Sequence, residues 1–254
     1  MIKLKTSAEI ETLRVGGRHL AQILHQLAKE VKPGVLTSEL DDLAQSLIKE
    51  IGAKPAFLNY KPAGSRLAYP AALCVSVNEE IVHGIPKKRV IKEGDVVTLD
   101  SGLIYQGLIT DSAITVTVGK VSDKILNLVE KTKESLALAI DQVKPGARLG
   151  DIGFAVEQHI KQAGLGLVRD LAGHGVGYLV HEDPLVPNYG KRGQGQVLEA
   201  GLVIAIEPMV TLGSGRTKLL NDGFTFVTAD DSMSAHFEHT VAVTNQGVLI
   251  LTNL

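Results

Sequence analysis

The chain has 254 residues, of which 44% are hydrophobic and 21% charged, so it is long enough for one large domain or two small ones with a substantial core. Its formal net charge of −2, without a basic block, argues against a DNA-binding or anionic-membrane surface. The single cysteine, Cys74, excludes an intrachain disulfide and a thiolate zinc cluster.

The first half of the chain is predicted to fold as two helices followed by strands. It starts without the apolar run of a signal peptide, and no window approaches about 18 consecutive apolar residues, so we expect a cytoplasmic protein without membrane contact. Apolar residues at helical spacing predict one helix over 7–30 and a second that begins with Thr37 or Ser38 as N-cap and ends at Gly52. Strand-like runs follow at 73–77, 96–99 and 108–118.

The second half repeats this order. Helices are predicted over 125–140 and over 152–163, the latter ending at Gly164, and strands at 202–206, 224–228 and 240–243. Val31-Lys32-Pro33-Gly34 and Val143-Lys144-Pro145-Gly146 are identical and lie 143 − 31 = 112 residues apart, each between two predicted helices. We therefore expect a single domain over 1–254 with an internal duplication, about 1–118 and 119–254, and a ligand cleft between the halves.

Two aspartates flank a predicted hairpin. Asp100 ends a run of apolar residues, and Asp111 follows a turn near Gln106-Gly107. Pairing across this turn would place residue 111 opposite or diagonal to residue 100, within about 5–8 Å on one face. Read singly, each could equally be an ordinary turn or strand-end residue.

Two glutamates and two histidines stand at comparable places. Glu207 follows an apolar strand, and Glu238 precedes another. His174 lies between glycines that would let the backbone bend and bring the imidazole close to a ligand, and His181 follows seven residues later. Salt-bridged edge residues and loop histidines remain open alternatives for these positions.

Taken together, four carboxylates and one imidazole are expected to meet in the cleft. Carboxylates about 4 Å apart would repel by roughly 4 kcal/mol per pair at an effective dielectric constant of 20. Two divalent cations would neutralise four such charges, and an oxygen-rich set with one histidine suits Mn, Fe, Co or Zn in a hydrolytic site. The chain lacks a Gly-x-Ser-x-Gly elbow and a Walker loop.

Six ordered motifs resemble those of the type I methionine aminopeptidases, which belong to the pita-bread hydrolases. The resemblance covers nearly the whole chain. The motifs are Ser76-Val77-Asn78-Glu79-Glu80 leading to His83-Gly84-Ile85-Pro86, then Asp100, Asp111, Gly173-His174-Gly175-Val176-Gly177 with His181-Glu182-Asp183-Pro184, Ile206-Glu207-Pro208-Met209 and Phe237-Glu238-His239-Thr240.

The resemblance implies an α+β pita-bread fold and a metal-dependent hydrolase that removes the initiator methionine of nascent proteins when the second residue is small. It implies that Asp111 and Glu238 bridge two divalent ions (Co, Mn, Fe, Zn or Ni), with Asp100, His174 and Glu207 as further ligands. His83, His181 and Glu207 would be the catalytic residues that contact substrate or move protons, and a metal-bound hydroxide would attack the first peptide carbonyl. A monomer with transient ribosome contact is expected.

Departures from the family pattern border the expected methionine pocket. The resemblance places Phe57, Tyr60, Tyr69, Cys74 and Phe224 around that pocket. Phe224 stands where relatives carry Trp, and Val180 where they carry Phe. The segment 56–70 is also longer than usual, so we expect a roomier pocket unless that segment folds inward.

Two alternative functions fit the same motifs less well. Proline-specific pita-bread peptidases carry an additional N-terminal domain and an Arg-containing motif at the last glutamate, where this chain has Phe237-Glu238-His239-Thr240. Non-catalytic pita-bread binding modules usually lose metal ligands, and all five positions are present here. The type II class carries an insertion between the motifs of His181 and Glu207, which lie only 207 − 181 = 26 residues apart.

Overall fold

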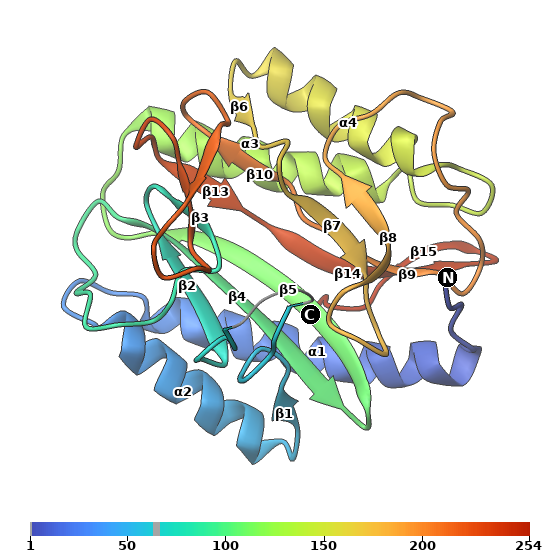
Figure 1. Ribbon diagram of the computed structural model, residues 1–254, viewed down its shortest axis with the longest axis horizontal. Helices are drawn as coiled ribbons and strands as arrows, with labels where there is room; N and C mark the ends of the chain where they lie inside the picture. Colours follow the sequence, from blue (N-terminus) through green and yellow to red (C-terminus); the bar gives the residue numbers. More distant parts are fainter. Residues whose placement is uncertain (1, 63–66) are drawn as a thin grey trace.

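Two helix pairs and a central antiparallel sheet form the architecture of the computed structural model, which describes residues 2–62 and 67–254. In Figure 1 the pair α1 and α2 runs along the bottom and the pair α3 and α4 along the top, with the strands between them. The helices are α1 (Ser7–Glu30), α2 (Thr37–Glu50), α3 (Asp123–Ile140) and α4 (Leu149–Gln162). The strands are β1 (Lys54–Pro55), β2 (Leu73–Val77), β3 (Glu80–Val82), β4 (Val96–Tyr105), β5 (Leu108–Thr117), β6 (Gly166–Leu167), β7 (Ala172–Gly175), β8 (Glu182–Pro187), β9 (Val203–Ile206), β10 (Met209–Thr211), β11 (Thr217–Leu219), β12 (Phe226–Thr228), β13 (Ser234–His236), β14 (Glu238–Thr244) and β15 (Gly247–Ile250).

All four predicted helices are present, but the start of α2 differs from the prediction. Its N-cap is Leu36, so Thr37 is already helical. The Leu36 amide donates to the carboxylate of Glu39, whereas the Thr37 hydroxyl donates to the carbonyl of Lys87, 2.9 Å away. The threonine hydroxyl thus fastens α2 to a distant loop instead of capping its own helix.

The predicted strands are present with adjusted bounds, and the sheet contains several short strands that the sequence did not suggest. The nine-stranded sheet has the order β1-β4-β5-β14-β9-β7-β8, with β2 paired to β4 and β15 to β14. The predicted strand 224–228 begins only at Phe226, because the Asp222 carboxylate accepts the amides of Phe224 and Thr225 in a turn.

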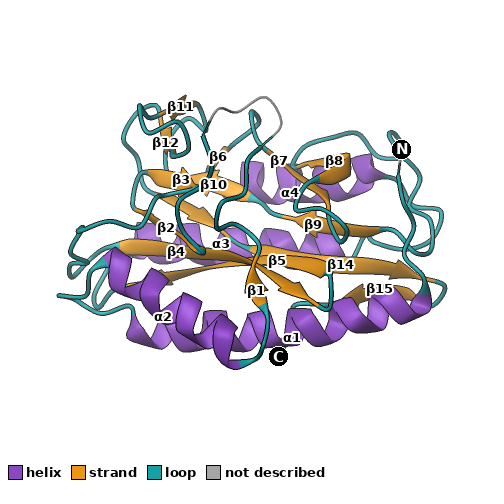
Figure 2. Ribbon diagram, turned by 60° about the horizontal axis from the view of Figure 1, so that its bottom comes forward, coloured by secondary structure: helices purple, strands orange, loops and turns teal. Residues whose placement is uncertain are grey.

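The buried apolar side chains follow the two halves of the sequence. One cluster joins α1 and α2 to β2 and β4, and another joins α3 and α4 to β9 and β14. Figure 2 shows α1 and α2 beneath the sheet, while β3, β10, β11 and β12 lie above it. This arrangement suits the predicted duplication and its division at about residue 118, which stay predictions. None of the described helices is both long and apolar enough to cross a membrane.

Candidate metal centre

Strand register brings the two hairpin aspartates together. In the β4–β5 ladder Asp111 pairs with Gly102 and Asp100 pairs with Ala113, so the two aspartates are diagonal neighbours on one face. The predicted diagonal pairing is confirmed. The backbone of Asp111 is fixed from the next strand, since its amide donates to the Thr240 hydroxyl and that hydroxyl donates to the Asp111 carbonyl.

Neighbouring strands add the glutamates and His174. Glu238 opens β14, opposite Ala113 of β5, and Glu207 directly follows β9. His174 lies in β7, where a side chain at Gly173 would stand 2.3 Å from the Ala205 carbonyl oxygen. The flanking glycines therefore allow close approach between strands, and the β7–β8 register shifts between His174 and Gly175.

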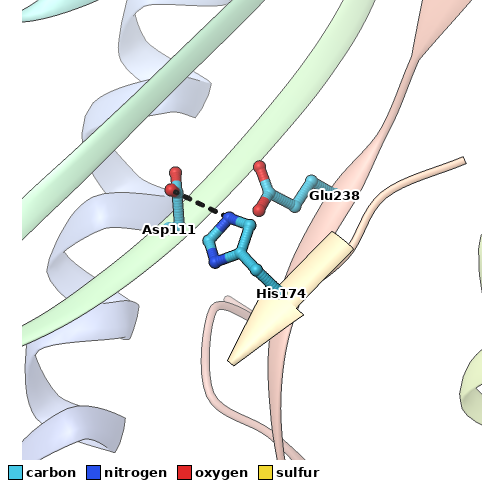
Figure 3. Close-up of side chains that lie close together, drawn as sticks. All are labelled: Asp111, His174 and Glu238. Atoms are coloured by element: carbon cyan, nitrogen blue, oxygen red, sulfur yellow. Dashed lines mark ion pairs between the residues drawn. The ribbon is translucent and has the colours of Figure 1, made fainter. Parts of the chain in front are cut away.

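The ligand atoms of Asp111, His174 and Glu238 all lie within 4.8 Å of one another. Figure 3 shows these three side chains converging from β5, β7 and β14 on one point. The Nε2 atom of His174 lies 3.5 Å from Oε1 of Glu207 and 4.0 Å from Oδ2 of Asp111. Such spacing allows the groups to share a cation.

Burial places these carboxylates in an unfavourable setting. It raises the pKa of Asp111 to about 7 and holds the pKa values of Asp100, Glu207 and Glu238 well above their ordinary range. Mutual repulsion adds to the effect for the latter three. Within the described ranges, one oxygen each of Asp100, Asp111 and Glu238 has no hydrogen-bond partner. Buried, unpartnered carboxylate oxygens fit a site that binds divalent cations.

The imidazole of His174 has the tautomer and the neutral charge that a metal ligand requires. Its Nδ1 lies 2.9 Å from the Gly175 carbonyl oxygen, which can only accept, so the ring hydrogen sits on Nδ1. Burial, followed by the nearby His181, lowers its pKa to about 3. The ring is therefore neutral, and Nε2 presents a lone pair to the carboxylates.

His181 and His83 stand beside this cluster. The ring of His181 lies 4.3 Å from that of His174, and its Nδ1 lies 2.8 Å from the Tyr60 hydroxyl. Burial lowers the pKa of His83 to about 4, with a further contribution from His181. His83 packs edge-on against Phe226, at 6.1 Å between ring centres.

A cavity of about 230 Å³ unites these groups with an apolar wall. The cavity is lined by all the predicted ligands, catalytic residues and pocket residues except Val180: Phe57, Tyr60, Tyr69, Cys74, His83, Asp100, Asp111, His174, His181, Glu207, Phe224 and Glu238. The described ends of the segment 56–70 line it too, while residues 63–66 of that segment lie outside the described residues.

Sequence reasoning missed two features around the site. His236 lies behind Glu207, with Nε2 3.7 Å from Oε2 of that glutamate. Lys5 forms a buried ion pair of 2.7 Å with Glu182, whose other oxygen accepts the Leu179 amide. This pair ties the N-terminal segment to the loop that carries His181. The position of Glu182 directly after His181 was the only hint in the sequence that this glutamate lies near the site.

The chain is similar to known proteins over nearly its whole length. Residues 11–245 match metallopeptidase family M24, and the chain belongs to this family. A methionine aminopeptidase of Aquifex aeolicus is 48% identical, with 100% of this chain and 99% of that protein covered. The crystal structure of a methionine aminopeptidase from Thermotoga maritima superimposes with a TM-score of 0.95 at 44% identity, each chain being covered completely.

The wider fold is shared with enzymes of other specificity. A prolidase from Pyrococcus horikoshii gives a TM-score of 0.77 at 24% identity, and the match covers 98% of this chain but 63% of the prolidase. The matches together confirm the predicted pita-bread fold and the predicted enzyme class, a metal-dependent methionine aminopeptidase.

Proposed function

We propose that this chain removes the initiator methionine from nascent polypeptides by hydrolysis of the first peptide bond, at a centre of two divalent ions. The observation that carries the proposal is the juxtaposition in one cavity of three buried carboxylates, the partly buried Glu207, a neutral histidine and an apolar wall. Carboxylates that hold metal ions suit hydrolysis of a peptide bond. The apolar residues on the other side of the cavity suit an apolar first side chain of the substrate.

The ligand set supports the number and kind of ions. Four carboxylates would match the charge of two divalent cations, which Asp111 and Glu238 together with Asp100, His174 and Glu207 would hold. Oxygen ligands with a single imidazole suit Mn, Fe, Co, Zn or Ni. Bound there, such ions lower the pKa of a coordinated water and polarise the first peptide carbonyl.

The chain's own groups orient the substrate and handle protons. Donation from the Tyr60 hydroxyl to Nδ1 of His181 would place the ring hydrogen on Nε2, which could then donate to the carbonyl oxygen as negative charge develops there. Glu207, whose pKa burial raises, can pass a proton to the leaving amine. His83 lines the same cavity and would contact the second residue of the substrate.

The apolar wall supports selection of methionine. Phe57, Tyr69 and Phe224 form a chain of edge-to-face rings, with centres 6.5 Å and 5.3 Å apart. Cys74 completes this wall. An unbranched thioether fits among aromatic edges, where sulfur contacts are favourable. We expect the enzyme to act as a cytoplasmic monomer in transient contact with the ribosome.

Metal analysis combined with peptide kinetics tests the proposal. Purified protein should contain two divalent ions per chain, and a chelator should abolish cleavage until Mn²⁺ or Co²⁺ is restored. Met-Ala-Ser should be cleaved far faster than Met-Lys-Ser, because the second side chain must fit beside the centre. Faster cleavage of Ala-Pro peptides would indicate a proline-specific enzyme, and full activity without metal would refute the metal centre.

A further inference from the structure

His236 is a buried histidine whose ring has no hydrogen-bond partner in the described part of the chain. Its residue is 1% exposed, and neither Nδ1 nor Nε2 is satisfied. The other histidines around the centre differ: His174 bonds Gly175, and His181 bonds Tyr60. A buried imidazole with two unsatisfied nitrogens is unfavourable unless a further group engages it.

The backbone of His236 is held rigidly, so the position of its ring is fixed by the fold. Its amide donates to the Thr115 hydroxyl at 3.0 Å, and that hydroxyl donates to its carbonyl at 2.6 Å. On the other side it pairs with Met209 in the β10–β13 ladder. Met209 lies two residues after Glu207, so this ladder also sets the distance between the imidazole and the carboxylate.

The two oxygens of Glu207 face two different imidazoles. Oε1 lies 3.5 Å from Nε2 of His174, and Oε2 lies 3.7 Å from Nε2 of His236. His174 lines the cavity together with the carboxylates, whereas His236 is not among the residues that line it. His236 therefore approaches the Glu207 carboxylate from outside the cavity.

We propose that His236 is a positioning residue for Glu207: its Nε2–H donates to Oε2, which leaves Oε1 directed toward the metal that His174 also binds. A carboxylate can only accept, so the ring hydrogen belongs on Nε2 in this arrangement. Hydrogen bonds of this kind orient ligating carboxylates, and their loss typically weakens metal binding by about 10–100-fold. The inference rests on the proposed metal centre.

Metal titration of the metal-free protein tests this role. His236→Ala should weaken Mn²⁺ binding by about 10–100-fold in calorimetry, and His236→Gln, whose amide can still donate to Oε2, should retain most of the affinity. His239→Gln is the matched control, because His239 adjoins Glu238 in sequence but its Nδ1 bonds Thr252 instead. It should bind Mn²⁺ as the unsubstituted protein does.

The possible results separate this inference from the proposed function. An unchanged Mn²⁺ affinity in His236→Ala would overturn the role of His236, as would equal losses in the Ala and Gln variants, which would indicate a packing effect. Failure of the unsubstituted protein to bind Mn²⁺ would instead refute the metal centre itself.

A measurement on the unsubstituted protein remains decisive if His236→Ala does not fold. Nitrogen NMR of histidine-labelled protein, loaded with Zn²⁺, should show Nε2 of His236 protonated and bonded to a carboxylate. A deprotonated Nε2 that coordinates Zn²⁺ would make His236 a ligand and overturn the positioning role. A hydrogen found on Nδ1 alone would overturn it equally.

Discussion

The proposed metal centre and the proposed methionine pocket share one cavity but are built in different ways. Asp111, His174 and Glu238 project from paired strands whose register fixes them within 4.8 Å of one another. The pocket wall instead takes Phe57 from the segment after α2 and Phe224 from a turn held by Asp222. The sheet therefore fixes the positions of the proposed metal ligands. The residues proposed to select the substrate lie in connecting segments, which can change without disturbing the sheet.

The largest expected effect is at Glu238, the bridging ligand of the proposed two-metal centre. Glu238→Ala should lower kcat/KM by at least about 10³-fold, roughly 4 kcal/mol in transition-state stabilisation, because both ions lose a shared ligand. Asp100→Ala removes a ligand that serves one ion and should be less damaging. Metal content per chain and peptide kinetics would measure both changes.

A buried aspartate outside the centre provides the control for this comparison. Asp41 accepts the amides of Ala72 and Leu73, each at 2.9 Å, so its carboxylate is satisfied by the fold. Asp41→Asn should reduce thermal stability and leave the metal content unchanged. Loss of metal in this variant would show that the centre depends on general packing and not on its own ligands.

The next largest effect is expected at His181, which adjoins His174 and which we propose is not a metal ligand. His181→Ala should lower kcat by about 10²–10³-fold, because its donor stabilises charge only as the carbonyl reacts. Metal content should stay at the unsubstituted level, and loss of the ions would make His181 a ligand. Tyr60→Phe, which removes the hydroxyl at Nδ1, should reproduce a smaller part of the loss in kcat.

The pH dependence of stability should distinguish the carboxylates of the cavity from its apolar wall, because only the carboxylates ionise. In the fold the pKa of Asp111 is about 7 instead of the ordinary 3.8. Between these values the metal-free folded chain binds more protons than the unfolded chain. The stability due to this group is therefore complete below about 3.8 and lost as the pH rises through about 7.

Thermal unfolding of chelated protein would check this sign. Asp111→Asn cannot ionise, so at about pH 8 its chelated form should melt roughly 5 °C above the chelated unsubstituted protein, with little difference at low pH. With Mn²⁺ in excess the order should reverse, since the variant lacks a ligand. Parallel pH profiles for the two chelated proteins would contradict a raised pKa at Asp111.

The sequence was most informative where local pattern determines geometry. Alternation along one hairpin was enough to place Asp100 and Asp111 on the same face, and the ends of apolar strands marked Glu207 and Glu238. His236 escaped notice because its burial depends on pairing with Met209, a contact between short strands that are remote in the chain. The strand β13 has only three residues, too few for a periodic pattern that would predict such a contact.

The pocket shows the same limit more strongly. Its residues were nominated by resemblance, and their placement depends on how the segment 56–70 returns to the sheet. Phe57 and Tyr69 face inward and contact each other edge-on, which fills part of the space that smaller neighbours leave. Residues 63–66, which the prediction of a longer loop included, lie outside the described residues. The roomier pocket therefore stays a prediction.

The smallest expected effect concerns that pocket and is a change in the ratio of the cleavage rates of Leu-Ala and Met-Ala peptides. Phe224 touches Tyr69 edge-on and lines the cavity, whereas Val180 packs in the same apolar cluster without lining it. Space at this wall should admit the branched side chain of leucine, and Leu-Ala and norleucine-Ala peptides should be cleaved measurably, though more slowly than Met-Ala. Phe224→Trp should refill the space and lower the rate for Leu-Ala relative to Met-Ala by about 10-fold, toward the low end of the roughly 1–3 kcal/mol that one methylene is worth. Phe154→Trp is the matched control, because Phe154 lies on α4 under Arg192 and does not line the cavity.

Substitutions at the metal ligands should slow all three peptides by the same factor, whereas Phe224→Trp should alter only their ratio. Equal losses for Met-Ala and Leu-Ala in Phe224→Trp would show that the wall supports the chemistry as well, and the separation between the carboxylates and the apolar wall would then fail.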